Sequence, residues 1–283
     1  MVFESRGKWL RKSLFNKTRI TFGRCQWVLG PVFFLVWKLF FSGKKVIVYT
    51  GVFGGTSRLR SPIPLSFFKT NVDFVCFTDE KLISDTWEIR EVDRVNQCPV
   101  STAKFYKMNP HKHFDSYEYA IWHDATIALN ADPRYLILKY LVRSDFAIHK
   151  NPFRDSVHAE AQACIDERVD KKEVIEEQIR RYERAGFPDN GGLVESAVLL
   201  MRPHKPHVRK MLEDWYGEIV NGSIRDQLSF NYTAWKNNFK YIEIKTNVRR
   251  SMNYIFLKHD RKNIINRARE NEKTASGPDG QFL

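Results

Sequence analysis

Short apolar runs rich in β-branched and aromatic residues alternate along this chain with longer stretches in which apolar residues recur at helical spacing. The short runs predict strands at residues 46–50, 73–78, 119–128, 145–149, 193–201, 241–244 and 254–257. The longer stretches predict helices at residues 101–108, 155–168, 171–185, 206–220 and 223–235. Strands that alternate with helices indicate the α/β class, with a layered sheet flanked by helices.

The same pattern divides the chain into three parts. Residues 44–265 hold the alternating elements and are expected to form the main domain. Residues 266–283 turn polar, and we expect a flexible tail there. Residues 1–43 combine a basic stretch with the apolar run WVLGPVFFLVWKLFF.

The apolar run near the N-terminus is short for a bilayer span, which needs about 20 mostly apolar residues. It also contains Pro31 and Lys38, while Trp27 and Trp37 suit an interfacial position. We therefore expect residues 1–43 to be a membrane-associating segment attracted to an anionic surface, on the cytoplasmic face. A short type II, Golgi-like anchor and a helix docked on the chain's own domain are the alternatives.

Composition narrows the class of protein. The 283 residues are 43% hydrophobic, which excludes a disordered chain. The net charge of +13 favours an anionic partner such as acidic lipid, nucleic acid or a phosphorylated substrate. No nucleic-acid-binding signature is present, so we expect no nucleic-acid partner. The four cysteines are widely spaced, without a C-x-x-C pair, which argues against a disulfide scaffold or a cysteine-rich zinc site.

Ligands of open α/β sheets bind beyond the carboxyl ends of the strands, so residues that follow strands are the first candidates. The first strand is followed by a glycine-rich turn that could bring backbone N–H groups close to a phosphate or nucleoside, although a plain tight turn explains it equally well. The residues of interest in this turn are Gly51, Phe53, Gly54 and Gly55. Asp79 follows the second strand and could accept hydrogen bonds from a base or ribose, or cap a turn.

Two lysines and one aspartate suggest a site for phosphate. Lys104 and Lys107 lie three residues apart, on one face of a predicted helix, where they could hold a diphosphate or form a solvated basic face. Asp124 lies within the apolar run 119–128, where a buried charge requires a partner. A divalent cation, Mn²⁺ or Mg²⁺, that bridges Asp124 to phosphate oxygens would supply one, and a buried salt bridge is the alternative. His259 could be a further metal ligand.

Further polar residues gather at later strand ends. One turn between a strand and a helix concentrates residues that could contact phosphate or sugar hydroxyls, namely His149, Lys150, Arg154 and Asp155, although Asp155 could also be a helix N-cap. Glu195 begins a strand after two glycines, and Asp226 with Gln227 lies in the first turn of a helix for which Ser223 is the expected cap. Glu195 and Asp226 are candidates for a general base, and each has a structural alternative.

Taken in order, these segments resemble a glycosyltransferase-like family with plant and bacterial members, long known only as a domain of unknown function. The resemblance is carried by KVIVYTGVFGG, DFVCFTD, AKFYKMNPHKHF, YEYAIWHDA, FAIHKNPFRD, EEQIRRYERAGFP, GLVESAVLLMR and SIRDQLSFNYTAWK. It implies a GT-A-like (Rossmann-like) mixed sheet and a nucleotide-diphospho-sugar donor.

The resemblance also implies residue roles. The glycine-rich turn and Asp79 would surround the nucleoside, and Lys104 and Lys107 would lie near the diphosphate. Asp124 and His259 would bind the metal, and Asp226 with Gln227 would face the acceptor. The chain departs from this pattern in lacking a D-x-D motif, because Trp122 stands where the first aspartate is expected. The two lysines could therefore replace the cation.

The expected function is transfer of a sugar to a hydroxyl of a glycan, polysaccharide or glycolipid. A cation or the lysines would stabilise the departing diphosphate. Asp226 or Glu195 would accept the acceptor's proton if the configuration inverts, or would stabilise the oxocarbenium-like centre if it is retained. The alternatives are a basic non-catalytic module that binds membrane or nucleic acid, which would not explain Asp124, and a membrane-surface hydrolase, for which no nucleophile motif is found.

Overall fold

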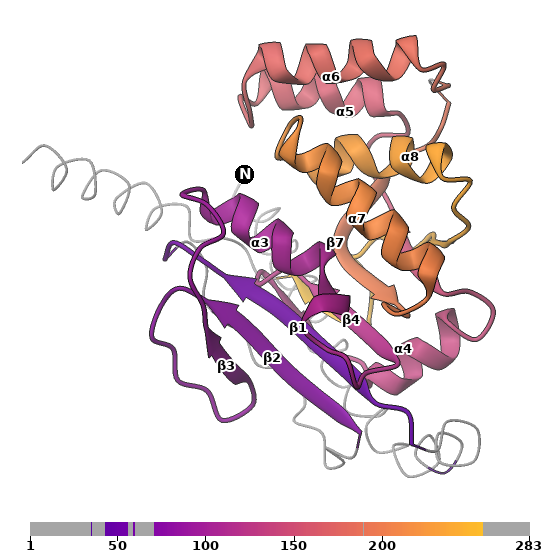
Figure 1. Cartoon of the computed structure of the whole chain (residues 1–283). Helices are drawn as coiled ribbons and strands as arrows, with labels where there is room; N and C mark the ends of the chain where they lie inside the picture. The colour runs from indigo at the N-terminus through magenta and orange to yellow at the C-terminus, as the bar shows by residue number, and fades with distance from the viewer. Residues whose placement is uncertain (1–34, 36–42, 56–58, 60–70, 189, 257–283) are drawn as a thin grey trace, which may run out of the picture.

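The computed structural model describes residues 35, 43–55, 59, 71–188 and 190–256. Its centre is a sheet with strand order β3-β2-β1-β4-β7-β6-β8 (Figure 1). In chain order these strands are β1 (Val46–Val52), β2 (Val72–Thr78), β3 (Glu88–Glu91), β4 (Tyr119–His123), β6 (Phe146–Lys150), β7 (Val194–Met201) and β8 (Ile242–Ile244). A separate antiparallel pair joins β5 (Ile127–Leu129) to β9 (Tyr254–Phe256).

The sheet is mixed, as predicted. Strands β3, β2, β1 and β4 are parallel to one another, and β6 is parallel to β8. Strand β7 runs antiparallel to both β4 and β6. The pairing of β6 with β7 shifts register between Ile148 and His149, so that Ile148 pairs with Leu199 and His149 with Glu195. Because β7 runs antiparallel to β4, the start of β7 lies beyond the end of β4, where the candidate site lies.

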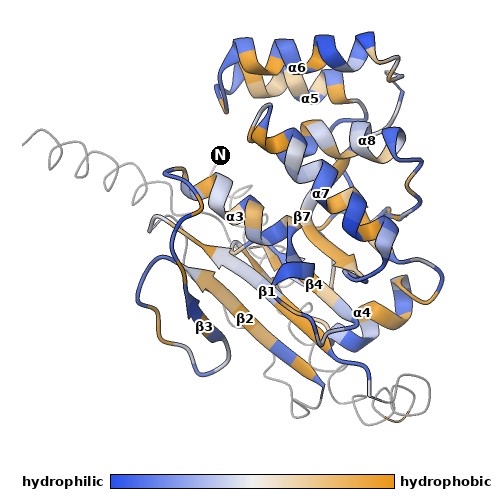
Figure 2. Ribbon diagram, in the orientation of Figure 1, coloured by the Kyte–Doolittle hydropathy of each residue, from blue (hydrophilic) through white to orange (hydrophobic). Residues whose placement is uncertain are grey.

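Helices cover both faces of the sheet because alternate residues of the buried strands point to opposite sides. From β1, Ile47 and Tyr49 pack in the core beneath α3, α7 and α8, and Val46 and Val48 pack in the core that contains α4. In Figure 2, β2 and β7 are mostly orange, whereas the edge strand β3 is blue. The helices are α3 (Pro99–Met108), the short η1 (Pro110–Lys112), α4 (Pro133–Tyr140), α5 (Val157–Asp166), α6 (Lys172–Arg184), α7 (Pro206–Val220) and α8 (Asp226–Lys236).

Helix α8 is buried on two sides. Phe230 and Ala234 pack in the core against the sheet, while Leu228 and Tyr232 pack in a second core with α5 and α6. The ring of Tyr232 stacks on that of Tyr182 from α6, with 3.8 Å between centroids. The two sides of α8 therefore fix the position of its N-terminus, where Asp226 lies.

The structure corrects several local predictions. The run 119–128 is not one strand, because β4 ends at His123 and Asp124 begins a turn in which the N–H of Ile127 donates to its carbonyl oxygen. Helix α8 has Arg225 as its N-cap in place of Ser223, and α5 is capped by Ser156 rather than Asp155. The sequence prediction also missed β3 and α4.

The predicted membrane-associating segment, the polar tail and His259 lie outside the described residues, apart from residues 35 and 43. Within the part of the chain that the structure describes, no helix combines the length and apolar character that a membrane span requires.

Candidate active site

The glycine-rich turn after β1 contacts the end of β2. The backbone N–H of Gly54 donates to Oδ1 of Asp79 at 3.0 Å, and Arg94 forms an ion pair with the same carboxylate. Gly54 has a φ of +69°, and a Cβ atom there would lie 2.7 Å from Cγ of Pro99 at the start of α3. The turn therefore needs glycine both for its backbone conformation and for its close approach to α3. The sequence-predicted residues Gly54 and Asp79 are thus brought together.

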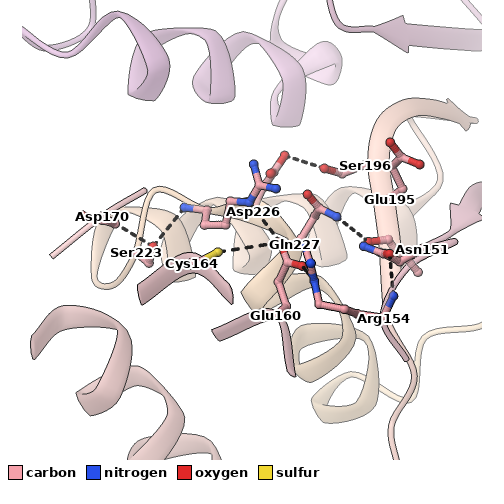
Figure 3. A network of polar contacts seen from close by, with 12 residues as sticks. Asn151, Arg154, Glu160, Cys164, Asp170, Glu195, Ser196, Ser223, Asp226 and Gln227 are labelled. Atoms are coloured by element: carbon pink, nitrogen blue, oxygen red, sulfur yellow. Dashed lines mark hydrogen bonds and ion pairs between the residues drawn. The ribbon is translucent and has the colours of Figure 1, made fainter. Parts of the chain in front are cut away.

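A lysine–aspartate cluster lies between α3, β7 and α8, and we use this name for Lys104, Lys107, Ser196 and Asp226. The carboxylate oxygen Oδ2 of Asp226 lies 2.5 Å from Nζ of Lys104 and 2.7 Å from Nζ of Lys107. The hydroxyl of Ser196 donates to the same oxygen at 2.8 Å (Figure 3). Lys107 and Asp226 are fully or almost fully buried, and 16% of the Lys104 side chain is exposed.

In this cluster two ammonium groups share one buried carboxylate, and the carboxylate of Asp124 lies beside them. Burial alone would raise the pKa of Asp226, but Lys104 and Lys107 hold it far below its ordinary value. Burial lowers the pKa of Lys104, an effect that Asp226 opposes. The indole of Trp215 also donates to the backbone carbonyl of Asp226 at 3.0 Å. The carboxylate therefore stays ionised, and the lysines are not the solvated face that their spacing alone allowed.

Asp124 lies beside this cluster at the end of β4. Its Oδ1 atom accepts a hydrogen bond from the Trp122 indole at 3.0 Å and lies 3.9 Å from Nζ of Lys107. Its backbone N–H donates to the carbonyl of Ala197 at 2.9 Å, which ties the end of β4 to β7. The side chain of Asp124 is 40% exposed, so its carboxylate is not buried in the core and is not enclosed in an internal salt bridge.

Glu195 lies at the start of β7, opposite His149 of β6. Its Oε1 atom is 3.2 Å from a guanidinium nitrogen of Arg249, and its Oε2 atom is buried without a hydrogen-bond partner among the described residues. Burial raises the pKa of Glu195, Arg249 lowers it, and Asp124 raises it further. A raised pKa makes this buried carboxylate a stronger proton acceptor than an ordinary glutamate.

His149 lies in the interior, which disfavours the predicted direct contact with an acceptor. The ring is 1% exposed, its Nδ1 atom lies 2.7 Å from the carbonyl of Thr246, and it packs edge-on against Tyr254. Burial lowers its pKa to about 4, so the ring is neutral at pH 7. His149 therefore supports the strand that carries its partner Glu195.

The other residues predicted on the acceptor side divide into two groups. Lys150 is the exposed last residue of β6, and Asp155 is exposed on the turn that follows. Arg154 donates to Oε2 of the buried Glu160 at 2.6 Å (Figure 3), and Arg225 donates to Oε1 of the same residue at 3.2 Å. Gln227 is nearly buried and donates to the carbonyl of Val194 at 3.2 Å, next to Glu195.

The described residues do not by themselves form a cage for Mn²⁺ or Mg²⁺. Asp124 supplies one carboxylate whose Oδ1 already accepts from Trp122, and the ammonium group of Lys107 is nearby. No group of three or more histidine, cysteine, aspartate or glutamate side chains suited to a metal is found among residues 43–55, 71–188 and 190–256. Lys104 and Lys107 supply positive charge at this position.

Sequence reasoning missed three contributors to the site. Ser196 had a signal, since it is a second polar residue beside Glu195 at the start of an otherwise apolar strand. Arg249 and Glu160 had none, because each is one of several like-charged residues in its segment. Their roles depend on contacts between distant parts of the chain.

Comparison with known proteins decides the family. The model of the TOD1/MUCI70 glycosyltransferase-like domain matches residues 39–270. This chain belongs to that family. The resemblance inferred from the sequence segments is thereby confirmed, and the family supports the prediction of a transferase.

Two individual proteins are similar to this chain. A probable hexosyltransferase, MUCI70 of Arabidopsis thaliana, is 27% identical over 250 residues, which cover 78% of this chain. The match spans 41% of the length of that relative. The apo crystal structure of mouse xyloside xylosyltransferase 1 is 10% identical and aligns with a TM-score of 0.37, over 72% of this chain and 85% of that one.

Proposed function

We propose that this domain transfers a sugar from a nucleotide-diphospho-sugar donor to a hydroxyl group of a glycan, polysaccharide or glycolipid. The observation that carries the proposal is the pair of lysines held beside the half-exposed Asp124, at the edge where β1 and β4 end. This is the edge at which open α/β sheets bind their ligands. Membership of a glycosyltransferase-like family supports the same reaction class.

On the donor side, Gly51, Phe53, Gly54, Gly55 and Asp79 surround the nucleoside in this proposal. Lys104 contacts the diphosphate, since its side chain is the partly exposed one of the pair. Lys107 is fully buried and contributes its positive charge from the protein interior. The leaving diphosphate gains negative charge as the glycosidic bond breaks, and fixed positive charge in a water-poor site lowers the energy of that transition state.

On the acceptor side, Glu195 is the better of the two proton acceptors named from the sequence. The low pKa of Asp226, caused by its two lysine partners, makes it a weak base. The raised pKa of Glu195 makes it a stronger one. If the reaction inverts the anomeric centre, Glu195 accepts the proton of the acceptor hydroxyl; if it retains the configuration, the carboxylate stabilises the oxocarbenium-like centre. Asp226 then keeps the lysines in place, and Gln227, Lys150, Arg154 and Asp155 surround the acceptor.

A metal requirement is a separate part of the proposal. Asp124 with His259 remains the candidate pair for Mn²⁺ or Mg²⁺, and the reaction steps above need neither ion. Residues 1–43 are proposed to hold the domain at an anionic membrane surface, on the cytoplasmic face or through a type II Golgi-like anchor. The metal requirement and the membrane association can each be measured directly.

The test is calorimetric titration of the purified chain with UDP- and GDP-sugars, with and without Mn²⁺, followed by mass spectrometry of the products. We expect one donor to bind and Asp124→Ala to weaken its binding at least tenfold. Asp166→Ala is the matched control, because Asp166 is an exposed residue of α5 whose carboxylate accepts a hydrogen bond from Gln162. Absence of binding to every donor under both conditions, with Asp124→Ala behaving as wild type, would overturn the transferase. Vesicle binding without donor binding would then favour a basic membrane-binding module.

A further inference from the structure

The ion pair of Glu195 with Arg249 joins two segments that are distant in sequence. Arg249 lies between β8 and β9, and its guanidinium group is 3.2 Å from Oε1 of Glu195. The side chain of Glu195 is 5% exposed and that of Arg249 is 40% exposed, so the arginine reaches the buried carboxylate from the surface. One carboxylate oxygen is thereby fixed, while Oε2 accepts no hydrogen bond from the residues that the structure describes.

Two aromatic rings hold the guanidinium group in place. Its central carbon lies 5.3 Å from the ring centroid of Phe153 and 5.0 Å from that of Phe256. Phe153 comes from the turn after β6 and is 63% exposed, although it is a large apolar residue. A planar guanidinium group can contact aromatic faces and donate to a carboxylate at the same time, whereas an ammonium group is a compact point charge. This geometry therefore favours arginine over lysine.

The charged groups around Glu195 come from several elements. Asp124 after β4 and Glu160 of α5 disfavour its negative charge, and Arg225 at the start of α8 favours it. His149 on the adjacent strand is neutral at pH 7. Arg249 is the strongest of the favourable partners and contacts the carboxylate directly.

We propose that Arg249, held between Phe153 and Phe256, is a positioning residue that fixes the carboxylate of Glu195 and keeps it charged. This inference rests on the proposed function, in which Glu195 serves the acceptor. Arg249 orients Oε1 and leaves Oε2 as the oxygen that acts. Its removal leaves a buried carboxylate near Asp124 and Glu160, which then takes up a proton at a higher pH.

The direct test is a pH titration of Glu195 by NMR in protein carrying ¹³C at the side-chain carboxyl carbon of glutamate, with the signal assigned from Glu195→Gln. We expect the midpoint to rise by about one pH unit or more in Arg249→Gln. Arg249→Lys keeps the charge but loses the planar contact, so we expect a smaller rise. Arg250→Gln removes the neighbouring exposed arginine and should leave the midpoint unchanged. Equal midpoints in wild type and Arg249→Gln, with both proteins folded by circular dichroism, would overturn the proposal.

The same variants in a transfer assay separate this inference from the proposed function. Activity that needs the ionised carboxylate is lost as pH falls through its pKa, so the acid limb of the kcat profile moves to higher pH in Arg249→Gln, with the donor KM unchanged. A shifted NMR midpoint in a protein that binds no donor supports the Arg249–Glu195 coupling but overturns the transferase. Transfer activity with neither the NMR midpoint nor the acid limb shifted overturns the positioning role alone.

Discussion

The ammonium nitrogen of Lys107 lies 2.7 Å from Oδ2 of Asp226, and both side chains are shielded from solvent. The two residues are 119 positions apart in the sequence, so their pairing joins α3 to the start of α8 on the same face of the sheet. Ser196 of β7 and Lys104 of α3 donate to the same oxygen. One buried carboxylate thus positions the two lysines, to which we assign the binding of the donor diphosphate.

Replacing Asp226 should destabilise the fold. Asp226→Asn leaves two lysines without their shared counter-charge, one of them fully buried. Removal of one partner from a buried ion pair costs about 3–5 kcal/mol. We expect a fall of this size in the free energy of unfolding, measured by urea denaturation at pH 7. Asp166→Asn on the exposed surface of α5 should change it by less than about 0.5 kcal/mol. A loss in Asp226→Asn no larger than in that control would show that the lysines find another partner.

Lys104 should matter more for donor binding than for stability, because part of its side chain is exposed. A hydrogen bond to a charged group contributes about 1.5–3 kcal/mol, which corresponds to about a tenfold or greater loss of donor affinity in Lys104→Met. Lys210→Met is the matched control, since Lys210 is an exposed residue of α7 that pairs with Asp214 one turn along. The measurement is calorimetric titration with the nucleotide sugar that binds the wild-type protein. Equal donor affinities in Lys104→Met and Lys210→Met would show that Lys104 does not contact the donor.

The buried His149 should make stability depend on pH. Its pKa falls from 6.5 in the unfolded chain to about 4 in the folded protein, because burial disfavours the charged ring. The unfolded state therefore binds more protons between these values, and stability is lost as pH falls below about 6.5. Between pH 7 and pH 5 the His149 contribution to this loss is about 2 kcal/mol.

The measurement for His149 is urea unfolding at the two pH values, in wild type and in His149→Gln. The other histidines are present in both proteins, so the difference between the two pH dependences isolates His149. The variant should lose about 2 kcal/mol less than wild type between pH 7 and pH 5. Identical pH dependences would show that this ring is not the buried neutral group described above.

Replacement of Gly54 by alanine should destabilise the protein more than the same replacement of another glycine of similar backbone conformation. Gly54 and Gly186 have φ values of +69° and +78°, but only at Gly54 would a Cβ atom collide with a neighbour, Cγ of Pro99 at 2.7 Å. The left-handed conformation alone costs alanine about 1–2 kcal/mol, which Gly186→Ala should show. Gly54→Ala should lose more than this in the same unfolding assay and should also displace the turn that contacts Asp79. Equal losses would mean that the collision with Pro99 is relieved without cost.

The sequence predicted the core of the fold because its signals are local. The apolar runs gave β1, β2, β6 and β7 to within two residues at each end, and α7 in full. It missed β3, whose residues Glu88–Glu91 lack an apolar run since they lie at the sheet edge. It merged β4 and β5 because the turn at Asp124 lies inside a continuous apolar stretch.

The candidate site was only partly predictable. Lys104, Lys107, Asp124, Glu195 and Asp226 were named from their positions after strands or on a helix face, and the structure brings them into one region. Their relationships were not visible in the sequence. Asp226 looked like a possible base, and the structure makes it the counter-ion of two lysines.

The sequence by itself determined the α/β class, the alternation of inward and outward side chains, and the family, because each is encoded in short contiguous segments. Only the tertiary structure decided which charges meet. The antiparallel placement of β7 between β4 and β6 and the burial of α8 on two sides bring Asp226 to the lysines and Glu195 to Arg249. In the interior a charge takes its pKa from whichever partner the fold supplies, and that partner can lie more than a hundred residues away.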